Sequence, residues 1–309
     1  MGRTLKQKLL KRGVNHARSR ALKRRQNARI GAFSWKTSSA RCTGSSHIQA
    51  GTPCQDWAMS KRFDNGDIAI SLADGAGSSK YSHYGSSLVA TRVSQLISDH
   101  FDEAFGNSAK KEVFKQRLIR QLQIDVSELT KLGINLTEDE RNHHSLPSRD
   151  QQLLVPCKVS DLACTILCIV VRGNRFVAIH VGDGVMGIEL TRYGNTILEV
   201  LSRPDNGEFA NETYFVTSSS AIESARMVTG RINSATRNVT GFILMSDGPE
   251  SALYNKREAA LAPACSKLLA ATRALEQDEM SFQLEKTLSG VIAKKTSDDC
   301  SLALMSRID

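Results

Sequence analysis

The chain has 309 residues, of which 40% are hydrophobic and 24% are charged, as in globular proteins. That length suits one large domain or two small ones. No apolar run reaches the roughly 18 residues of a membrane span, and no apolar core follows the basic N-terminus as in a secretory signal. The seven cysteines form no CxxC pair, so we expect a cytoplasmic protein with reduced thiols and no zinc site.

The net charge of +9 is unevenly distributed along the chain. Residues 1–55 hold 13 Lys and Arg and no acid, which leaves 41 − 13 = 28 basic against 32 acidic residues, a net of −4. Residues 3–29 alone contain 11 Lys and Arg. We expect residues 1–32 to form a flexible basic arm and residues 33–309 to form the folded domain. The arm could bind a polyanion or an acidic protein surface, serve as an import signal, or have no role.

The predicted elements begin with a strand in residues 33–40 and a loop that leads to Gln55-Asp56, where a second strand starts. Asp64-Asn65-Gly66-Asp67 predicts a tight turn. The apolar run after this turn predicts a buried strand that ends at Asp74. Apolar residues at helical spacing then predict two helices, at about 84–105 and 110–132.

The second half of the chain is richer in β-branched residues, after a polar loop in residues 133–158 that includes His143-His144. Four successive runs predict a meander of antiparallel strands, at 162–171, 175–181, 185–190 and 196–201. Further strands are expected at 213–217, 241–246 and 300–305, and helices at about 251–274 and 281–293.

Acidic residues recur where these predicted strands begin or end, and three of them are followed by glycine. Each one alone could be an ordinary turn aspartate. Together they favour a carboxylate-rich site for Mg²⁺ or Mn²⁺, which prefer oxygen ligands. Two such ions can activate a water for in-line attack on phosphorus; the chain offers neither a GxSxG motif nor a Walker A loop. The candidates are Asp56, Asp74, Asp183, Asp247 and Asp298 or Asp299.

The ordered motifs QDW, ADGAG, ACTIL, HVGDG, MSDG and DDCSLAL resemble those of the metal-dependent protein phosphatase 2C family. The first motif and the stretch GEFANETYF at 207–215 are most similar to its bacterial branch. The resemblance covers residues 33–309. It implies an α+β fold, a four-layer α/β/β/α sandwich of two antiparallel sheets flanked by helices.

The resemblance also implies a site for two or three Mn²⁺ or Mg²⁺ ions. Asp74 would bridge two ions, and the carbonyl of Gly75 would bind one of them. Asp247 and Asp298 would hold the other, with Asp298 favoured over its neighbour because the family motif is Asp-Asn. Asp183 matches an aspartate linked to a further, weaker ion.

Other family roles fall on less certain positions. Asp56 would orient a metal-bound water and Thr165 would lie near the site. Eukaryotic members have Glu in place of Gln55, and their phosphate-binding arginine has no clear counterpart here, since Gly51 stands at its position. Substitutes for this arginine could be His47, unless that histidine is structural, or Arg41.

The loop 203–211 is long and polar. We expect it to border the substrate cleft through Glu208 and Asn211.

The expected activity is hydrolysis of phosphoserine and phosphothreonine in a phosphoprotein, with Asp56, Asp74 and Asp247 as catalytic residues and with a protein kinase as the counterpart enzyme. The alternative is a catalytically weak, phosphatase-like binding module with a polyanion-binding arm. The retained aspartates favour the enzyme, because a pure binder has no need of them.

Overall fold

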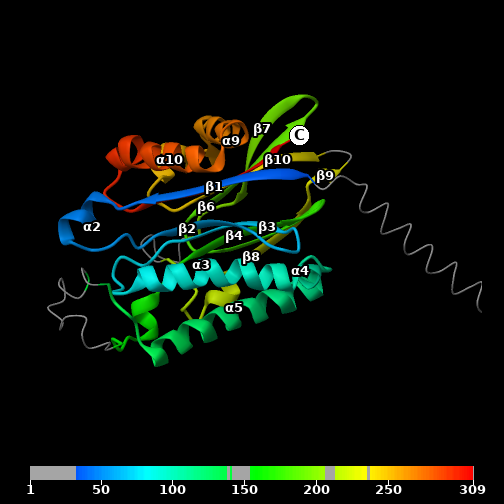
Figure 1. Cartoon of the computed structure of the whole chain (residues 1–309). Coiled ribbons are helices and arrows are strands. Elements are labelled where there is room, and N and C mark those ends of the chain that lie inside the picture. Colours follow the sequence, from blue (N-terminus) through cyan, green and yellow to red (C-terminus); the bar gives the residue numbers. More distant parts are fainter. Residues whose placement is uncertain (1–32, 138–139, 141–153, 206–212, 235–236, 309) are drawn as a thin grey trace, which may run out of the picture.

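The computed structural model describes residues 33–137, 140, 154–205, 213–234 and 237–308. Two antiparallel sheets pack face to face, and helices cover both outer surfaces (Figure 1). The predicted four-layer α/β/β/α sandwich is therefore confirmed. The expected basic arm, residues 1–32, lies outside the described residues.

The first sheet has the strand order β1-β13-β10-β6-β7, with the short β9 paired to β10. The second sheet has the order β2-β3-β4-β5-β8. The strands of the first sheet are β1 (Ser34–Cys42), β13 (Cys300–Ile308), β10 (Arg237–Met245), β6 (Val185–Arg192), β7 (Asn195–Ser202) and β9 (Asn233–Ser234). The strands of the second are β2 (Trp57–Arg62), β3 (Ile68–Ala73), β4 (Ile166–Arg172), β5 (Arg175–Val181) and β8 (Arg226–Arg231).

The predicted four-strand meander is wrong in one respect, because its strands belong to two sheets. β4 and β5 form a hairpin in the second sheet, whereas β6 and β7 form one in the first. The chain crosses between the sheets at Gly182-Asp183-Gly184. Gly182 has φ +112°, and a Cβ there would lie 2.5 Å from Thr165 Cγ2, so this crossing requires glycine. Asp183 is thus placed at the end of both sheets.

The core between the sheets comes from the alternate, inward-facing side chains of both. Its largest members include Ile70, Leu72, Leu167, Phe176 and Phe242. The aromatic rings of Phe176 and Phe242 meet edge to face, with centroids 5.1 Å apart. Because the two sheets are fixed against each other here, the strand ends that carry the aspartates are held in one place.

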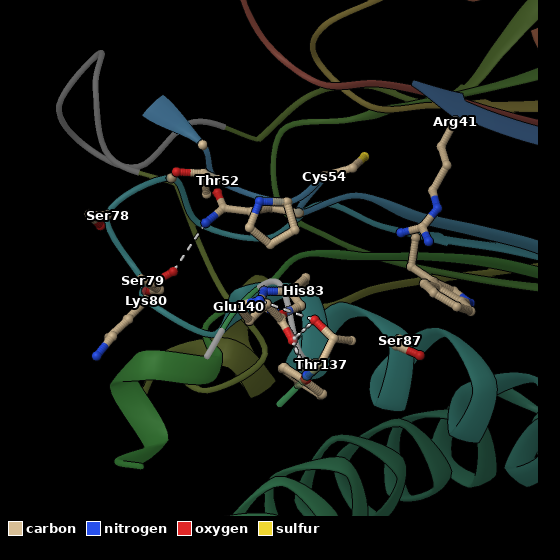
Figure 2. Close-up of a pocket in the computed structure, with 16 residues that line it drawn as sticks. Arg41, Thr52, Cys54, Ser78, Ser79, Lys80, His83, Ser87, Thr137 and Glu140 are labelled. Atoms are coloured by element: carbon tan, nitrogen blue, oxygen red, sulfur yellow. Dashed lines mark hydrogen bonds and ion pairs between the residues drawn. The ribbon is translucent and has the colours of Figure 1, made fainter. Parts of the chain in front are cut away.

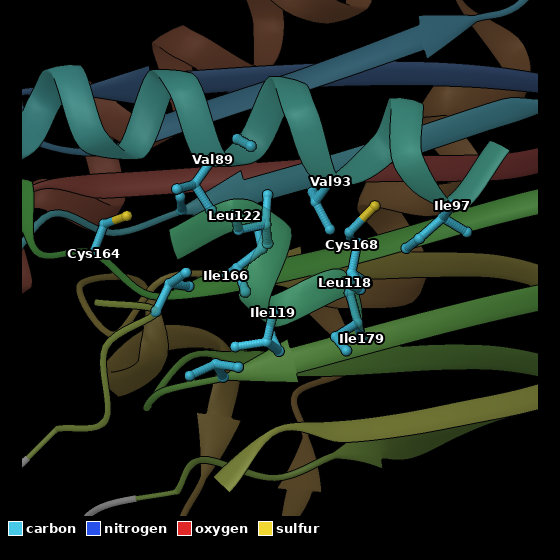
Figure 3. Close-up of a cluster of buried hydrophobic side chains, with 14 of the residues drawn as sticks. Val89, Val93, Ile97, Leu118, Ile119, Leu122, Cys164, Ile166, Cys168 and Ile179 are labelled. Carbon is cyan, nitrogen blue, oxygen red and sulfur yellow. The ribbon is translucent and has the colours of Figure 1, made fainter. Parts of the chain in front are cut away.

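Two long helices, α3 (Ser82–Asp99) and α5 (Ser108–Leu132), cover the second sheet (Figure 1). The Asn107 side chain caps α5 by accepting from the Lys110 N–H at 3.0 Å. Figure 3 shows apolar side chains of α3 and α5 packing against those of the β4 and β5 region. The side chains labelled there are Val89, Val93, Ile97, Leu118, Ile119, Leu122, Cys164, Ile166, Cys168 and Ile179.

The opposite face of the sandwich is covered by α9 (Ala264–Ala274) and α10 (Gln277–Thr287), which pack on the first sheet (Figure 1). A π turn (Leu288–Ile292) and a 3-10 turn (Ala293–Lys295) continue α10. None of the helices in the described part of the chain has the length and hydrophobicity needed to cross a bilayer.

Several predicted elements differ from the structure. The helix expected at 84–105 ends at Asp99 and is followed by a separate turn, α4 (Phe101–Ala104). A short helix, α2 (Ser45–Ala50), lies in the expected first loop. The strand expected at 213–217 is absent from the described part of that stretch, which turns instead into α7 (Ala221–Ser224) and the unpredicted β8.

Two further corrections concern the ends of the β block. The strand expected at 162–171 begins only at Ile166, after a 3-10 turn (Val159–Leu162). The helix expected at 251–274 is interrupted by a small hairpin. That hairpin separates α8 (Glu250–Leu253) from α9 and consists of β11 (Tyr254–Asn255) and β12 (Ala260–Leu261).

Candidate active site

The predicted aspartates are brought together at one end of the sandwich. Asp74 follows β3 directly, and burial raises its pKa well above the usual value. The negative charges of other aspartates raise this pKa further, which requires them to lie nearby in a poorly screened environment. These aspartates, in decreasing order of effect, are Asp56, Asp247, Asp183 and Asp298.

Asp56 lies just before β2 and is fully buried. Burial raises its pKa to about 7, and the charge of Asp299 adds to this effect. The hydroxyls of Ser301 and Ser246 lie near enough to lower the pKa in part. Neither carboxyl oxygen has a hydrogen-bond partner among the described residues. An ionised carboxylate that is buried without hydrogen bonds destabilises the folded protein unless a positive charge compensates it.

Asp247, two residues after β10, is half-buried and likewise has a raised pKa and, among the described residues, an unpartnered oxygen. Its burial raises the pKa to about 6, with further increases from the charges of Asp298 and Asp183. Within the described chain, its Oδ1 has no hydrogen-bond partner. The fold therefore concentrates negative charge that its own groups leave largely uncompensated.

Glu250 is a member of this acidic region that sequence reasoning missed. It is 5% exposed, and its charge raises the pKa of Asp247. Its Oε2 pairs with Lys256 Nζ at 2.7 Å, whereas Oε1 has no partner in the described part of the molecule. Its spacing of three residues after Asp247, within the turn that opens α8, is the signal that could have identified it.

The backbone around Asp74 is held by Thr165, the residue directly before β4. The Asp74 N–H donates to Thr165 Oγ1 at 2.9 Å, and the Thr165 N–H donates to the Asp74 carbonyl at 2.8 Å. At Gly75, a Cβ would lie 2.7 Å from Ser82 Oγ and 2.8 Å from the Gln55 carbonyl. Close packing thus explains the glycine after the aspartate, and Thr165 has a visible role in supporting the loop.

The neighbours Asp298 and Asp299 have different environments. Asp299 is 2% exposed, and its carboxylate accepts from the N–H groups of Gly44 at 2.7 Å and Gln55 at 2.6 Å. Its Oδ1 also lies 3.0 Å from His47 Nδ1. Asp299 therefore anchors the loop before β2, with His47 as its partner. Asp298 is exposed, and its charge acts on Asp74 and Asp247.

The chemistry of these groups suits a hard divalent cation. All the donors are carboxylate or carbonyl oxygens, and Mg²⁺ typically binds through one or two carboxylates while it keeps several waters. No three His, Cys, Asp or Glu side chains in the described chain form a closed metal site by themselves. The unpaired oxygens of Asp56 and Asp247 are consistent with ions held partly through water.

The substrate-contacting candidates are only partly within the described structure. Glu208 and Asn211 lie outside the described residues. Arg41, at the end of β1, donates from Nη1 to the Asp56 carbonyl at 2.6 Å and stacks on Trp57 at 4.2 Å. It lines a cavity of about 660 Å³ that also includes Gln55, the residue before Asp56 (Figure 2).

Comparison with known proteins agrees with this architecture. The family model described as Protein phosphatase 2C matches residues 43–289. Serine/threonine-protein phosphatase 3 of Escherichia coli (strain K12) is 25% identical over 283 residues, which cover 88% of this chain and 98% of that protein.

Two solved structures share the fold at low sequence identity. The serine/threonine phosphatase Stp1 from Staphylococcus aureus is 14% identical, with a TM-score of 0.54, covering 90% of this chain and 96% of that chain. PppA, a key regulatory component of T6SS in Pseudomonas aeruginosa, is 15% identical with a TM-score of 0.52, covering 89% of this chain and 99% of that chain. With four-fifths of its length matched by the family model, the chain belongs to the protein phosphatase 2C family of serine/threonine phosphatases, which are phosphoric monoester hydrolases.

Proposed function

We propose that the chain is a Mn²⁺- or Mg²⁺-dependent phosphatase that acts on phosphoserine and phosphothreonine in proteins. The observation that carries this proposal is the cluster of mutually repelling aspartates, gathered from five separate segments of the chain around the fully buried Asp56. Such a cluster is unfavourable in a protein that merely folds and binds. When bound, two divalent ions would supply an activated water and offset the negative charge that develops on phosphorus.

The residues divide this work by position. Asp74, whose pKa responds to all the other aspartates of the cluster, is the proposed shared ligand, together with the Gly75 carbonyl. Asp247 and Asp298 would complete the site on the side of the first sheet. Asp183, at the crossing between the sheets, would serve a weaker, additional ion.

Asp56 has a different proposed role, because it is the most deeply buried aspartate of the cluster. Its oxygens make no hydrogen bond to a described residue, so they are available to accept from the attacking water and orient it. No side-chain nucleophile is needed in this scheme, since the water attacks phosphorus directly.

The remaining assignments concern the substrate. Glu208 and Asn211 are proposed to contact the phosphoprotein. Arg41, the candidate for the missing phosphate-binding arginine, is better placed for residues beside the phosphate, because it lines a cavity that none of the clustered aspartates lines. His47 and Thr165 are better explained as supports of the Asp299 and Asp74 loops. A cytoplasmic location, a partner kinase and a polyanion-binding arm in residues 1–32 stay predictions, as does a catalytically weak binding module as the alternative.

The test is phosphate release from a phosphothreonine peptide by metal-stripped enzyme, with and without added Mn²⁺. We expect activity only with the metal, and a loss of several orders of magnitude in Asp74→Asn. Asp102→Asn is the matched control, because Asp102 is 73% exposed and pairs with Arg175 on another part of the surface. Equal release in EDTA, or near-normal turnover by Asp74→Asn, would contradict the proposal.

A further inference from the structure

A cavity of about 660 Å³, lined by both polar and apolar side chains, is shown in Figure 2. We call it the flanking pocket; its walls include Arg41, Gln55, Trp57, Ser79, Lys80 and His83. None of the clustered aspartates lines it. Two of its walls nevertheless continue directly into the cluster, because Gln55 precedes Asp56 and the loop 77–80 follows Asp74. The pocket is therefore a neighbour of the reacting centre.

The two walls nearest the cluster are tied together. Gln55 Nε2 donates to the Ser79 carbonyl at 3.2 Å, and Ser86 Oγ on α3 donates to the Gln55 carbonyl at 2.6 Å. Gln55 is only 2% exposed, yet its Oε1 has no hydrogen-bond partner among the described residues. A buried amide acceptor of this kind normally has a partner. Because this oxygen is itself buried, it belongs to the packed wall and is not a contact for a ligand in the pocket.

The electrostatic character of the pocket is positive. Arg41 uses Nη1 for a neutral carbonyl and stacks on Trp57, and Lys80 lies over the ring of Tyr81 at 4.9 Å. In the described part of the chain, neither cation pairs with a carboxylate. Figure 2 shows the two side chains in different walls of the pocket. A ligand between them would therefore meet two uncompensated positive charges.

Glu140, the one carboxylate that lines the pocket within the described chain, is already engaged by its neighbours. It pairs with His83 Nε2 at 2.5 Å and accepts from the Tyr84 hydroxyl at 2.9 Å. Thr137 donates to it from both N–H and Oγ1 at 2.7 Å. Burial alone would raise the pKa of Glu140, but these interactions together outweigh it and lower the pKa to about 2, so Glu140 stays ionised and engaged. It stabilises the wall without cancelling the charges of Arg41 and Lys80.

We propose that the flanking pocket binds the polypeptide segment next to the phosphorylated residue and that Arg41 and Lys80 select segments with acidic side chains. The inference rests on the proposed phosphatase activity and adds the class of substrate. The pocket itself would hold the segment, and its tied walls would keep the pocket in shape. Acidic side chains would then supply the selectivity, because opposite charges in a partly enclosed pocket attract more strongly than in open water.

The test compares three phosphothreonine peptides whose flanking residues are Glu, Ala or Lys and which are otherwise identical. The fourth substrate is p-nitrophenyl phosphate, which has no flanking residues. We expect wild-type kcat/KM to follow the order Glu, Ala, Lys, mainly through KM. Lys80→Glu should reduce the Glu-to-Lys preference by about 1.4- to 5-fold, the range for exposed charge pairs. Its turnover of p-nitrophenyl phosphate should be unchanged.

Lys61→Glu is the matched control. Lys61 also lies over an aromatic ring, that of Phe63 at 4.7 Å, but does not line the flanking pocket. The Lys61→Glu substitution changes the net charge by the same amount as Lys80→Glu, so it reports any long-range electrostatic effect on peptide preference. Added salt should shrink the wild-type preference, because it screens exposed charges.

The outcomes separate the two proposals. If no phosphorylated substrate is hydrolysed with Mn²⁺, the proposed function fails. If p-nitrophenyl phosphate is hydrolysed but Lys80→Glu and Lys61→Glu show the same peptide preference, the phosphatase assignment stands and the role of the flanking pocket is wrong. A wild-type enzyme that prefers the Lys-flanked peptide would equally overturn the inference.

Discussion

Replacement of Asp56 by Asn should stabilise the metal-free protein while it impairs catalysis. Asp56 is fully buried, and its oxygens have no hydrogen-bond partner in the described chain. Its pKa rises from 3.8 to about 7. At about 1.4 kcal/mol per pKa unit, the ionised carboxylate costs folding on the order of 4 kcal/mol. Asparagine has nearly the same shape but carries no charge, so it removes this cost.

The pH dependence has a definite sign. Because the folded-state pKa of Asp56 exceeds the unfolded value, folding takes up a proton, and stability falls as pH rises from about 4 to about 7. The stabilisation by Asp56→Asn should therefore be small near pH 4 and complete above about pH 7. For a domain of this size, a gain on the order of 4 kcal/mol raises the melting temperature by roughly 10 °C.

The assay is thermal unfolding in EDTA at pH 4, 6 and 8, with Asp102→Asn as a control of the same charge change at an exposed site. Saturating Mn²⁺ should reduce or reverse the difference between wild type and Asp56→Asn, because the ions stabilise the folded state that binds them. A variant that melts below the wild type at pH 8 in EDTA would refute the idea that Asp56 is an uncompensated buried charge.

Three further results are expected. Millimolar Mn²⁺ should raise the melting temperature of the wild type at pH 8, relative to a buffer of equal ionic strength without divalent cations; no shift would argue against a cation site. Asp247→Asn should lower phosphopeptide turnover by several orders of magnitude, whereas Asp183→Asn should mainly raise the Mn²⁺ concentration required; equal defects would contradict the ranking. A protein starting at Ala32 should keep its turnover of p-nitrophenyl phosphate and lose salt-sensitive binding to heparin; loss of turnover would place residues 1–31 in the folded domain.

The order of strands and helices could be predicted because the periodicity of local runs identifies them without reference to their partners, whereas the four-layer fold class came from the family resemblance. The error at Gly182-Asp183-Gly184 has a physical cause. A glycine-rich turn between two apolar runs looks the same whether the strands pair with each other or continue into different sheets. The partner of each strand is decided by long-range packing of the two sheets, and β8 was missed because its side chains are only half-buried.

The aspartates could be predicted as a set, since strand ends and glycine neighbours are visible in the sequence. Their separate roles were expected only from the family resemblance, because local patterns do not distinguish them. Asp298 and Asp299 are adjacent and chemically identical, and only the N–H groups of Gly44 and Gln55 on Asp299 distinguish them. Glu250 was missed because it carries no strand-end signal. The flanking pocket is built from four separate segments, which no local pattern connects.

The central claim is that the aspartate cluster holds divalent cations, and anomalous diffraction from crystals grown with Mn²⁺ tests it most directly. Data collected at the manganese absorption edge identify the ions without reference to activity. The account predicts two strong peaks that share Asp74, with Asp247 and Asp298 next to one of them. Strong peaks elsewhere, with none at Asp74, would contradict it.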